Sequence, residues 1–349
     1  MAVRMIWAAL IGLGACFCSG DPEPPVPVIG VSVDIPAAGS SASVVRDLAA
    51  LRQMGARLLY VSVKWAELEP QPGHYVFKPI DDATNGARML GFRLLLTLQT
   101  IDTNNRTLPA DLQTLPFGDR RIAMRFSALL RALAPRITKE VAWVMLGNEA
   151  DVYLAAHPAE LEPFAELVES GRAVLHAAHR GVAVGVTATF DGVLRHPAVV
   201  RRLNRNTDVL GLTYYPLGGD FTVRPARDVA EDVDAMARFA GGKLIVLQEA
   251  GYPAGRGAGS SDAAQAEFVD ALFAALARHA RSFQAVNYFL LYDFGKDMVE
   301  GFVRYYGVPG ERFRAFLATL GLKREDGTPR PAWEHFRNQL TRWRMRMLR

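Results

Sequence analysis

The stretch that decides the fold is VAWVMLGNEADVY, residues 141–153. Its first six residues carry no charge and are rich in strand formers, which is typical of a parallel strand covered on both faces. Gly147, Asn148 and Glu149 end this run, so we expect a buried strand with a carboxylate at its C-terminal tip. Residues 244–253, LIVLQEAGYP, repeat the design and end their apolar run at Glu249. If both strands belong to one barrel, the two carboxylates converge on a single site at one face.

Composition indicates a globular chain with a large core, since 50% of the 349 residues are hydrophobic and 22% are charged. Length alone permits two domains, but α/β barrels often exceed roughly 250 residues as one domain. The net charge is +4, and no stretch interleaves aromatic and basic residues as nucleic-acid modules do. We therefore expect no nucleic-acid partner and interpret the arginines of the last helix as a solvated face.

The N-terminus has the pattern of an export signal. An apolar run over residues 5–15 follows Arg4 and is too short to span a bilayer. Leu13-Gly14-Ala15-Cys16 resembles the bacterial lipobox, which implies a lipid on Cys16 and a cell-envelope lipoprotein, periplasmic or at the cell surface. A soluble secreted form and an uncleaved segment remain alternatives. We predict a signal peptide over residues 1–15, a Pro-rich tether over 16–27 and one domain over 28–349, without internal disulfides because no Cys follows Cys18.

Hydrophobic periodicity alternates between strands and helices along the rest of the chain. The predicted strands are residues 28–33, 57–63, 92–98, 141–146, 182–187, 209–213, 244–247 and 285–291. The predicted helices are residues 43–54, 83–90, 120–133, 160–179, 194–203, 229–239, 263–280 and 331–347. Eight alternating strands favour a (β/α)8 TIM barrel, and the rival open sheet lacks a Gly-rich dinucleotide turn after its first strand. Long polar segments after the strands, 100–119, 217–228, 252–262 and 293–310, are expected to roof the active face.

Two strand-end glutamates are the pair that glycosidic hydrolysis requires, one carboxylic acid and one carboxylate. We assign Glu149 as acid/base, with a pKa raised by the charge of Glu249, and Glu249 as nucleophile. Tyr215 is expected to hydrogen-bond Glu249, and Asn148 to bind the sugar 2-hydroxyl. Either glutamate alone is more often a helix cap or an ion-pair partner, but the matched positions of the two favour catalysis.

Three motifs resemble the clan A retaining glycoside hydrolases: Gly147-Asn148-Glu149, Tyr214-Tyr215-Pro216 and Glu249-Ala250-Gly251-Tyr252-Pro253. Residues 64–77, KWAELEPQPGHYVF, are similar to the W-x-x-x-E-P-x-x-G-x-Y-x-F pattern of many members. Residues 208–216 are locally similar to the endo-β-1,4-galactanase family. The resemblance implies a barrel hydrolase of β-linked glycans. Two positions depart from the clan, because Tyr60 stands where an Arg is usual and Tyr288-Phe289 where a Trp is frequent.

The expected activity is retaining, endo-acting cleavage of β-linked polysaccharide or oligosaccharide without metal or organic cofactor. The sequence contains no H-x-H or H-E-x-x-H motif, which argues against a metal-dependent hydrolase, and no G-x-S-x-G motif, which argues against a serine nucleophile. Aromatic residues near strand ends are candidate sugar-stacking platforms, with core packing as the alternative for each; they are Trp65, Tyr153, Phe190, Tyr252 and Tyr292. The departure at Tyr60 keeps open a second class, a non-catalytic carbohydrate-binding barrel.

Overall fold

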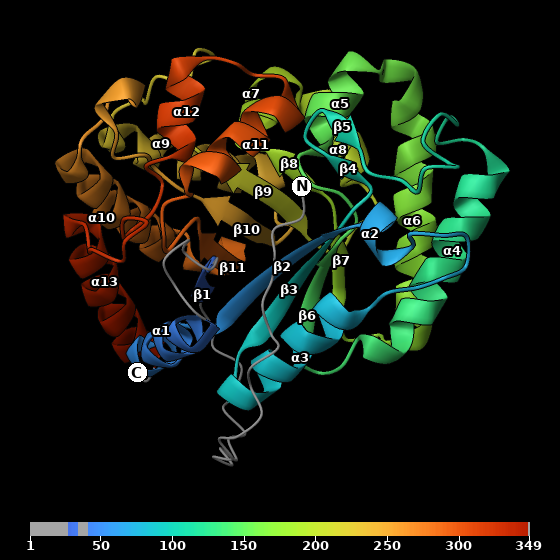
Figure 1. Cartoon of the computed structure of the whole chain (residues 1–349), viewed down its shortest axis with the longest axis horizontal. Coiled ribbons are helices and arrows are strands. Elements are labelled where there is room, and N and C mark those ends of the chain that lie inside the picture. The colour runs from blue at the N-terminus through green and yellow to red at the C-terminus, as the bar shows by residue number, and fades with distance from the viewer. Residues whose placement is uncertain (1–26, 34–40, 348–349) are drawn as a thin grey trace. The chain divides into compact units, whose positions relative to one another are not determined.

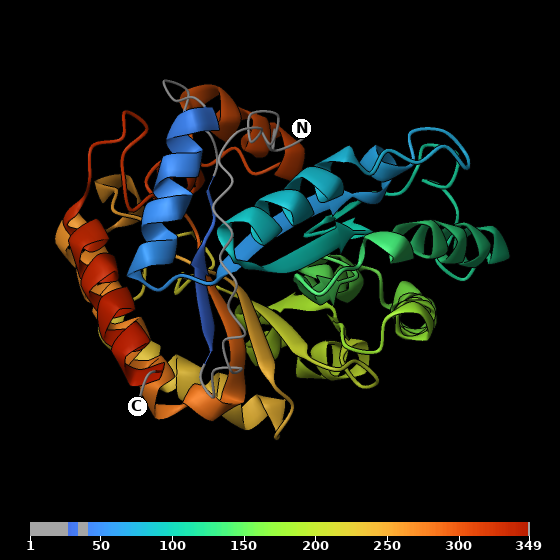
Figure 2. The same ribbon diagram turned by 90° about the horizontal axis from the view of Figure 1, so that it is seen from below.

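The computed structural model describes residues 27–33 and 41–347 (Figures 1 and 2). The predicted signal peptide, Cys16 and the predicted tether up to residue 26 lie outside the described residues, so these predictions stay untested. Among the helices that the structure describes, none combines the length and apolar character needed to cross a membrane.

Nine strands of the described residues form one sheet in the order β7-β6-β3-β2-β1-β11-β10-β9-β8. The end strands β7 (Ala183–Gly185) and β8 (Thr187–Thr189) are consecutive in the chain and separated only by Val186. They therefore act as one strand, and the order is that of a nearly closed eight-stranded barrel. The pairings β1–β11, β1–β2, β3–β6, β6–β7 and β8–β9 are all parallel. In the order and direction of its strands, the sheet confirms the predicted (β/α)8 class.

Each predicted strand is present with shifts of a few residues at its ends. The observed strands are β1 (Val28–Val31), β2 (Leu58–Lys64), β3 (Arg93–Gln99), β6 (Val141–Met145), β7, β8, β9 (Leu210–Tyr214), β10 (Ile245–Ala250) and β11 (Phe283–Tyr288). β6 is buried at all five positions, as expected for a strand covered on both faces.

The predicted helices are also present, and two match to the residue. They are α1 (Ser41–Met54), α3 (Lys78–Leu90), α4 (Arg120–Leu133), α6 (Leu161–Ala178), α9 (Val229–Ala240), α10 (Asp262–Arg278) and α13 (Pro331–Met347). α4 shows why its ends are readable from sequence. The Asp119 side chain accepts a hydrogen bond from the Arg121 backbone N–H and caps the first turn. Ile122, Phe126 and Leu130 recur at intervals of four and bury one face.

The structure corrects three predictions about local elements. The helix predicted over 194–203 is two helices, α7 (Phe190–Arg195) and α8 (Pro197–Leu203), because Pro197 disfavours helical backbone at His196 and starts a new first turn. The segment predicted as a polar loop over 293–310 contains α11 (Lys296–Tyr306), whose Val299 and Val303 are buried one turn apart. The segment over 100–119 contains a hairpin of β4 (Ile101–Asp102) and β5 (Asn105–Arg106). The short helices α2 (Trp65–Leu68), α5 (Ala150–Ala156) and α12 (Glu311–Leu317) were not predicted.

The chain divides into two compact units. Among the described residues, unit 1 comprises 27–33, 41–58, 214–242 and 249–347, and unit 2 comprises 59–213 and 243–248. In unit 2, α4 packs along α6 (Figure 1). In unit 1, α13 packs along α10 and also contacts α1 (Figure 2). The assignment of residues 28–349 to a single domain stays a prediction.

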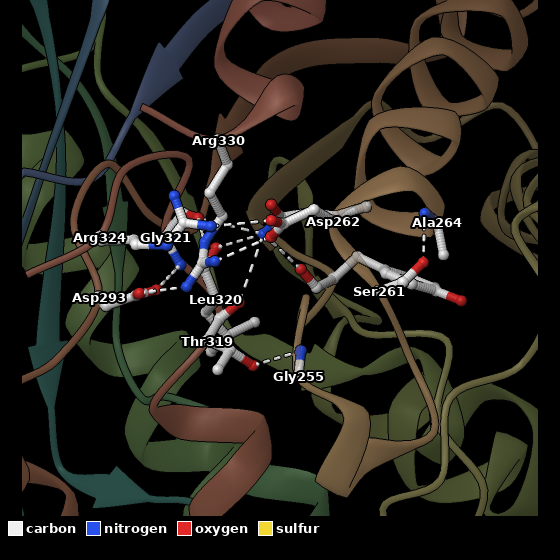
Figure 3. Close-up of polar contacts among 12 residues, drawn as sticks. Gly255, Ser261, Asp262, Ala264, Asp293, Thr319, Leu320, Gly321, Arg324 and Arg330 are labelled. Carbon is white, nitrogen blue, oxygen red and sulfur yellow. Dashed lines mark hydrogen bonds and ion pairs between the residues drawn. The ribbon is translucent and has the colours of Figure 1, made fainter. Parts of the chain in front are cut away.

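A buried ion-pair network organises the loops of unit 1 (Figure 3). The Arg330 guanidinium, 7% exposed, donates to Asp262 at 2.9 Å, to the Gly321 carbonyl at 3.1 Å and to Asp293. Burial nevertheless raises the pKa of Asp293 to about 6, because the loss of hydration outweighs the favourable charge of Arg330. The network ties the segment after β11 to the N-terminus of α10.

Candidate active site

Glu149 follows β6 through a sharp change of backbone direction in unit 2. Gly147 has φ 148°, which only glycine adopts readily, and Glu149 itself has φ 45° in the left-handed region. A non-glycine residue in this region is uncommon, and such backbone strain clusters at functional sites. The strand-end position predicted for Glu149 is therefore present, with a backbone conformation that the surrounding structure must hold.

Both carboxylate oxygens of Glu149 accept hydrogen bonds from threonine hydroxyls. Thr103 donates to Oε2 and Thr213 donates to Oε1, each at 2.7 Å. Burial raises the pKa of Glu149, the negative charge of Asp102 adds to this rise, and the two threonine hydrogen bonds partly oppose it. The predicted direction of the pKa shift is confirmed. The largest cause of the shift is burial, however, whereas the predicted cause was the charge of Glu249.

Asn148 is held by a buried network of amides and hydroxyls in the same unit. Its Nδ2 donates to Asp102 Oδ1 at 3.0 Å, and its Oδ1 accepts from Gln248 Nε2 at 2.7 Å. Gln248 Oε1 in turn accepts from Thr97 at 2.6 Å and from Thr187 at 2.7 Å. With these partners occupied, the Asn148 amide has one orientation. Asn148 and Gln248, the residues that precede the two glutamates in the chain, are thus directly hydrogen-bonded.

Glu249 lies near the end of β10 in unit 1, where the predicted contact with Tyr215 is confirmed. The Tyr215 hydroxyl donates to Glu249 Oε2 at 2.7 Å. The Tyr215 ring packs edge-on against Phe289 and Phe316, with ring centroids 6.2 and 5.2 Å away, which fixes its direction. Gly251 permits this approach, because a Cβ there would lie 2.9 Å from the Tyr215 ring and 2.3 Å from the Phe289 carbonyl oxygen.

Two predicted sugar platforms are wrong because their rings are buried. Trp65 has an exposed fraction of 0%, packs on Phe126 with centroids 5.1 Å apart, and donates from Nε1 to Glu69 at 2.8 Å. Tyr252 is 2% exposed, stacks on Phe268, and donates its hydroxyl to a backbone carbonyl. Both rings belong to the core, as the alternative interpretation of the aromatic residues expected, and the fully buried Glu69 also accepts a hydrogen bond from the Gly73 N–H.

The weaker platform candidates are also largely covered by protein. Tyr153, 9% exposed, stacks on His157 with centroids 4.0 Å apart. Tyr292, 6% exposed, donates its hydroxyl to Asp47 and lies beside the Lys323 ammonium. Phe190 is 4% exposed. The platform prediction gains no support from any of these three rings. At the departures from the clan pattern, Tyr288 is buried on β11, whereas Phe289 is half-buried beside Tyr215.

The polar residues that surround Glu149 and Asn148 were not predicted from the sequence. Asp102 and Thr103 lie three and four residues after the end of β3, so a polar pair close to a predicted strand end was a signal in the sequence. Thr213 and Gln248 lie inside strand patterns and carried no such signal. Asp151, on α5, is buried and accepts from the Thr189 backbone N–H and hydroxyl at 2.8 and 2.7 Å. Burial raises the pKa of Asp151 to about 7, and the charge of Glu149 adds to the rise.

Comparison with known proteins identifies the fold. No protein-family model matches the chain, and no curated protein matches it in sequence. Among solved structures, an exo-β-1,4-mannosidase from Opitutaceae bacterium strain TAV5 is similar with a TM-score of 0.75 at 16% identity, over 93% of this chain and 60% of that one. A GH5_18 protein from Streptomyces cattleya, solved with GlcNAc, is similar with a TM-score of 0.73 at 17% identity, over 92% and 81% of the two chains. A family 39 glycoside hydrolase from Bacteroides cellulosilyticus WH2 gives a TM-score of 0.66 at 15% identity, over 93% and 65%.

The fold is therefore the parallel-strand barrel of these glycosidases, as the clan resemblance implied. At this level of identity the likeness concerns the fold alone. The chain spans 60% of the length of the mannosidase. The local similarity to endo-β-1,4-galactanases stays a prediction.

Proposed function

We propose that the protein is a retaining glycoside hydrolase of β-linked glycans, with Glu149 as general acid/base and Glu249 as nucleophile. The observation that carries this proposal is the contrast between the environments of the two carboxyl groups. Glu149 is half-buried, and the loss of hydration around its carboxyl group raises its pKa, which keeps a proton available for a leaving group. Glu249 is also half-buried, and its Oε2 accepts one hydrogen bond, from the Tyr215 hydroxyl.

Glu149 and Glu249 both take part in each of the two steps of a double displacement. As the bond between the anomeric carbon and the leaving oxygen breaks, Glu149 gives its proton to that oxygen and Glu249 forms an ester to the anomeric carbon. Water next attacks the anomeric carbon, returns a proton to Glu149 and releases Glu249. The Tyr215 hydroxyl donates a hydrogen bond to Oε2 of Glu249 and so orients the carboxylate for attack. No step in this scheme requires a metal or an organic cofactor.

The comparisons support this proposal through the fold, and they suggest which sugar to test first. Proteins of similar fold include an exo-β-1,4-mannosidase and a GH5_18 variant from Streptomyces cattleya in complex with Manβ1-4GlcNAc. We propose β-mannosides as the first substrates to assay, together with galactans, glucans and xylans. Endo action remains part of the proposal, and it predicts oligosaccharides of several lengths as early products.

The test is turnover on this panel with the anomer of the first product followed by proton NMR. Release of product in the β configuration supports retention, whereas the α configuration would show inversion and remove Glu249 as nucleophile. Binding without turnover across the panel would favour the second class, a non-catalytic carbohydrate-binding barrel. If a monosaccharide is the sole early product, the enzyme acts at chain ends (exo action) and the endo proposal is wrong.

We also propose that the protein is exported and carries a lipid on Cys16 in the cell envelope. The motivation is the short apolar run followed by Leu13-Gly14-Ala15-Cys16. The proposed polar tether would then hold the barrel off the membrane, where glycan can reach it.

A further inference from the structure

The hairpin of β4 and β5 brings two consecutive polar residues to the Asn148–Glu149 turn. Asp102 accepts from Asn148 Nδ2 at 3.0 Å, and Thr103 donates to Glu149 Oε2 at 2.7 Å. We infer that Asp102 and Thr103 are positioning residues, each of which holds one of the two side chains of the Asn148–Glu149 pair. This inference rests on the proposed function for its catalytic meaning.

Backbone hydrogen bonds lock the hairpin to the turn. The Asn148 N–H donates to the Ile101 carbonyl and the Thr103 N–H donates to the Asn148 carbonyl, both at 2.9 Å. The Tyr153 N–H, on α5, donates to the Thr103 carbonyl at 3.0 Å. β4 accordingly lies beside α5 (Figure 1). These bonds fix the distance between the two segments, so the side-chain contacts follow from the backbone.

Thr103 and Glu149 share an uncommon conformation. Thr103 has φ 56° and Glu149 has φ 45°, and both are non-glycine residues in the left-handed region. Threonine is β-branched, which makes positive φ more costly for it than for most residues. Two such residues joined by a side-chain hydrogen bond indicate that the local strain is retained because it directs the Thr103 hydroxyl at Glu149.

The rest of the hairpin is anchored away from the turn. The Thr107 hydroxyl donates to the Gln99 carbonyl at 2.7 Å. The Arg106 guanidinium lies over the Phe117 ring, 4.4 Å from its centroid, and donates to the Leu115 carbonyl. Asp102 and Thr103 therefore sit on a supported loop, as positioning residues must.

The two positioning residues act on the acidity of Glu149 with opposite signs. The charge of Asp102 raises the pKa of Glu149, whereas the hydrogen bond from Thr103 lowers it because it stabilises the carboxylate. Thr213 also lowers the pKa of Glu149 through its hydrogen bond, and the charge of Glu149 in turn raises the pKa of Asp151. Neutralising Asp102 and deleting the Thr103 hydroxyl must then shift the titration of Glu149 in opposite directions.

The experiment compares Asp102→Asn, Thr103→Val and Thr103→Ser in the full chain. We expect Asp102→Asn to lower the pKa of Glu149, Thr103→Val to raise it, and Thr103→Ser to restore the wild-type value. The direct measurement is 13C NMR titration of glutamate-labelled protein, with the Glu149 signal assigned by its loss in Glu149→Gln. In each variant, the alkaline limb of the pH profile of kcat/KM should move in the same direction as the pKa of Glu149, because Glu149 must be protonated to act as an acid. Thr103→Val should also lower kcat roughly tenfold on a substrate with a poor leaving group, the factor for one lost hydrogen bond.

Matched controls come from the same unit, away from the hairpin's supports. Asp111→Asn removes an exposed carboxylate that pairs with Arg125, and Thr138→Val removes a hydroxyl that donates to the carboxylate of Glu140. Neither residue touches Glu149, so neither variant should change its titration.

The inference would be overturned if Asp102→Asn and Thr103→Val shift the pKa of Glu149 in the same direction, or if neither variant shifts it. Equal shifts of this pKa in the control variants would also overturn it. If Asp102→Asn does not fold, the Val and Ser variants of Thr103 still decide it. Opposite shifts in a protein that hydrolyses no glycan would support the positioning roles and remove the proposed hydrolase function.

Discussion

Replacing Asp151 with Asn should remove a pH-dependent loss of stability from this protein. Asp151 is 1% exposed, and burial raises its pKa from about 3.8 to about 7. The folded protein therefore holds a proton that the unfolded chain releases between about pH 4 and pH 7. Because the folded state binds more protons in this window, the free energy of unfolding falls as pH rises through it. Below about pH 4 the carboxyl group is protonated in both states, and its full contribution is present.

The magnitude follows from the size of the shift. A difference of about 3 pH units at roughly 1.4 kcal/mol per unit amounts to about 4 kcal/mol, an order-of-magnitude value that is reached above about pH 7. Asn resembles the protonated acid in shape but cannot ionise. Relative to wild type, Asp151→Asn should therefore be about equal at pH 4 and more stable at pH 8, with the difference rising between these limits.

The assay is urea unfolding of both proteins at pH values from 4 to 8, with the wild-type curve subtracted from that of the variant. Subtraction cancels the contributions of other titrating groups, such as Asp293, whose pKa is raised to about 6. Parallel pH dependence of the two proteins would refute the reasoning. A variant that loses stability equally at every pH would show that the hydrogen bonds of Asp151 with Thr189 matter more than its charge.

Three further predictions concern the proposed chemistry and localisation. Glu149→Ala should lose about 10²–10⁴-fold in kcat on a substrate with a poor leaving group. With an activated leaving group the same variant should accumulate a covalent intermediate, and added azide should convert this intermediate to a β-glycosyl azide. Glu249→Ala should form no covalent intermediate, and any azide product that it gives should be the α anomer. The same anomer from both variants would reverse or remove the assignment. Tyr215→Phe should lower kcat by about 10- to 100-fold, the range for a hydrogen bond to a charged group, with little change in a denaturation midpoint; a large loss of stability instead would indicate a packing role. Cys16→Ala should release the protein from membranes or block its maturation while Cys18→Ala does neither, and equal fractionation of the two would remove the lipid anchor.

Local pattern alone was sufficient for the strands, most helices and the positions of the two glutamates. Apolar runs of residues 141–146 and 244–247 are strand-like without reference to any partner, and a polar break at Glu149 or Glu249 marks the strand end directly. The contact of Tyr215 with Glu249 was also predictable, because both residues lie at or just after the C-terminal ends of strands, and these ends share one face in a barrel. These inferences needed only periodicity and the rule that parallel strands end together.

The tertiary structure alone decided the environment of Glu149 and the fate of the aromatic residues. Thr103 and Thr213, 46 and 64 residues away in the chain, supply its hydrogen bonds, and burial by the assembled unit sets the direction of its pKa shift. Whether Trp65 faces sugar or core depends on Glu69 and Phe126, which meet it only after folding. Desolvation and side-chain burial are properties of packing between distant segments, so they are absent from any local pattern of residues.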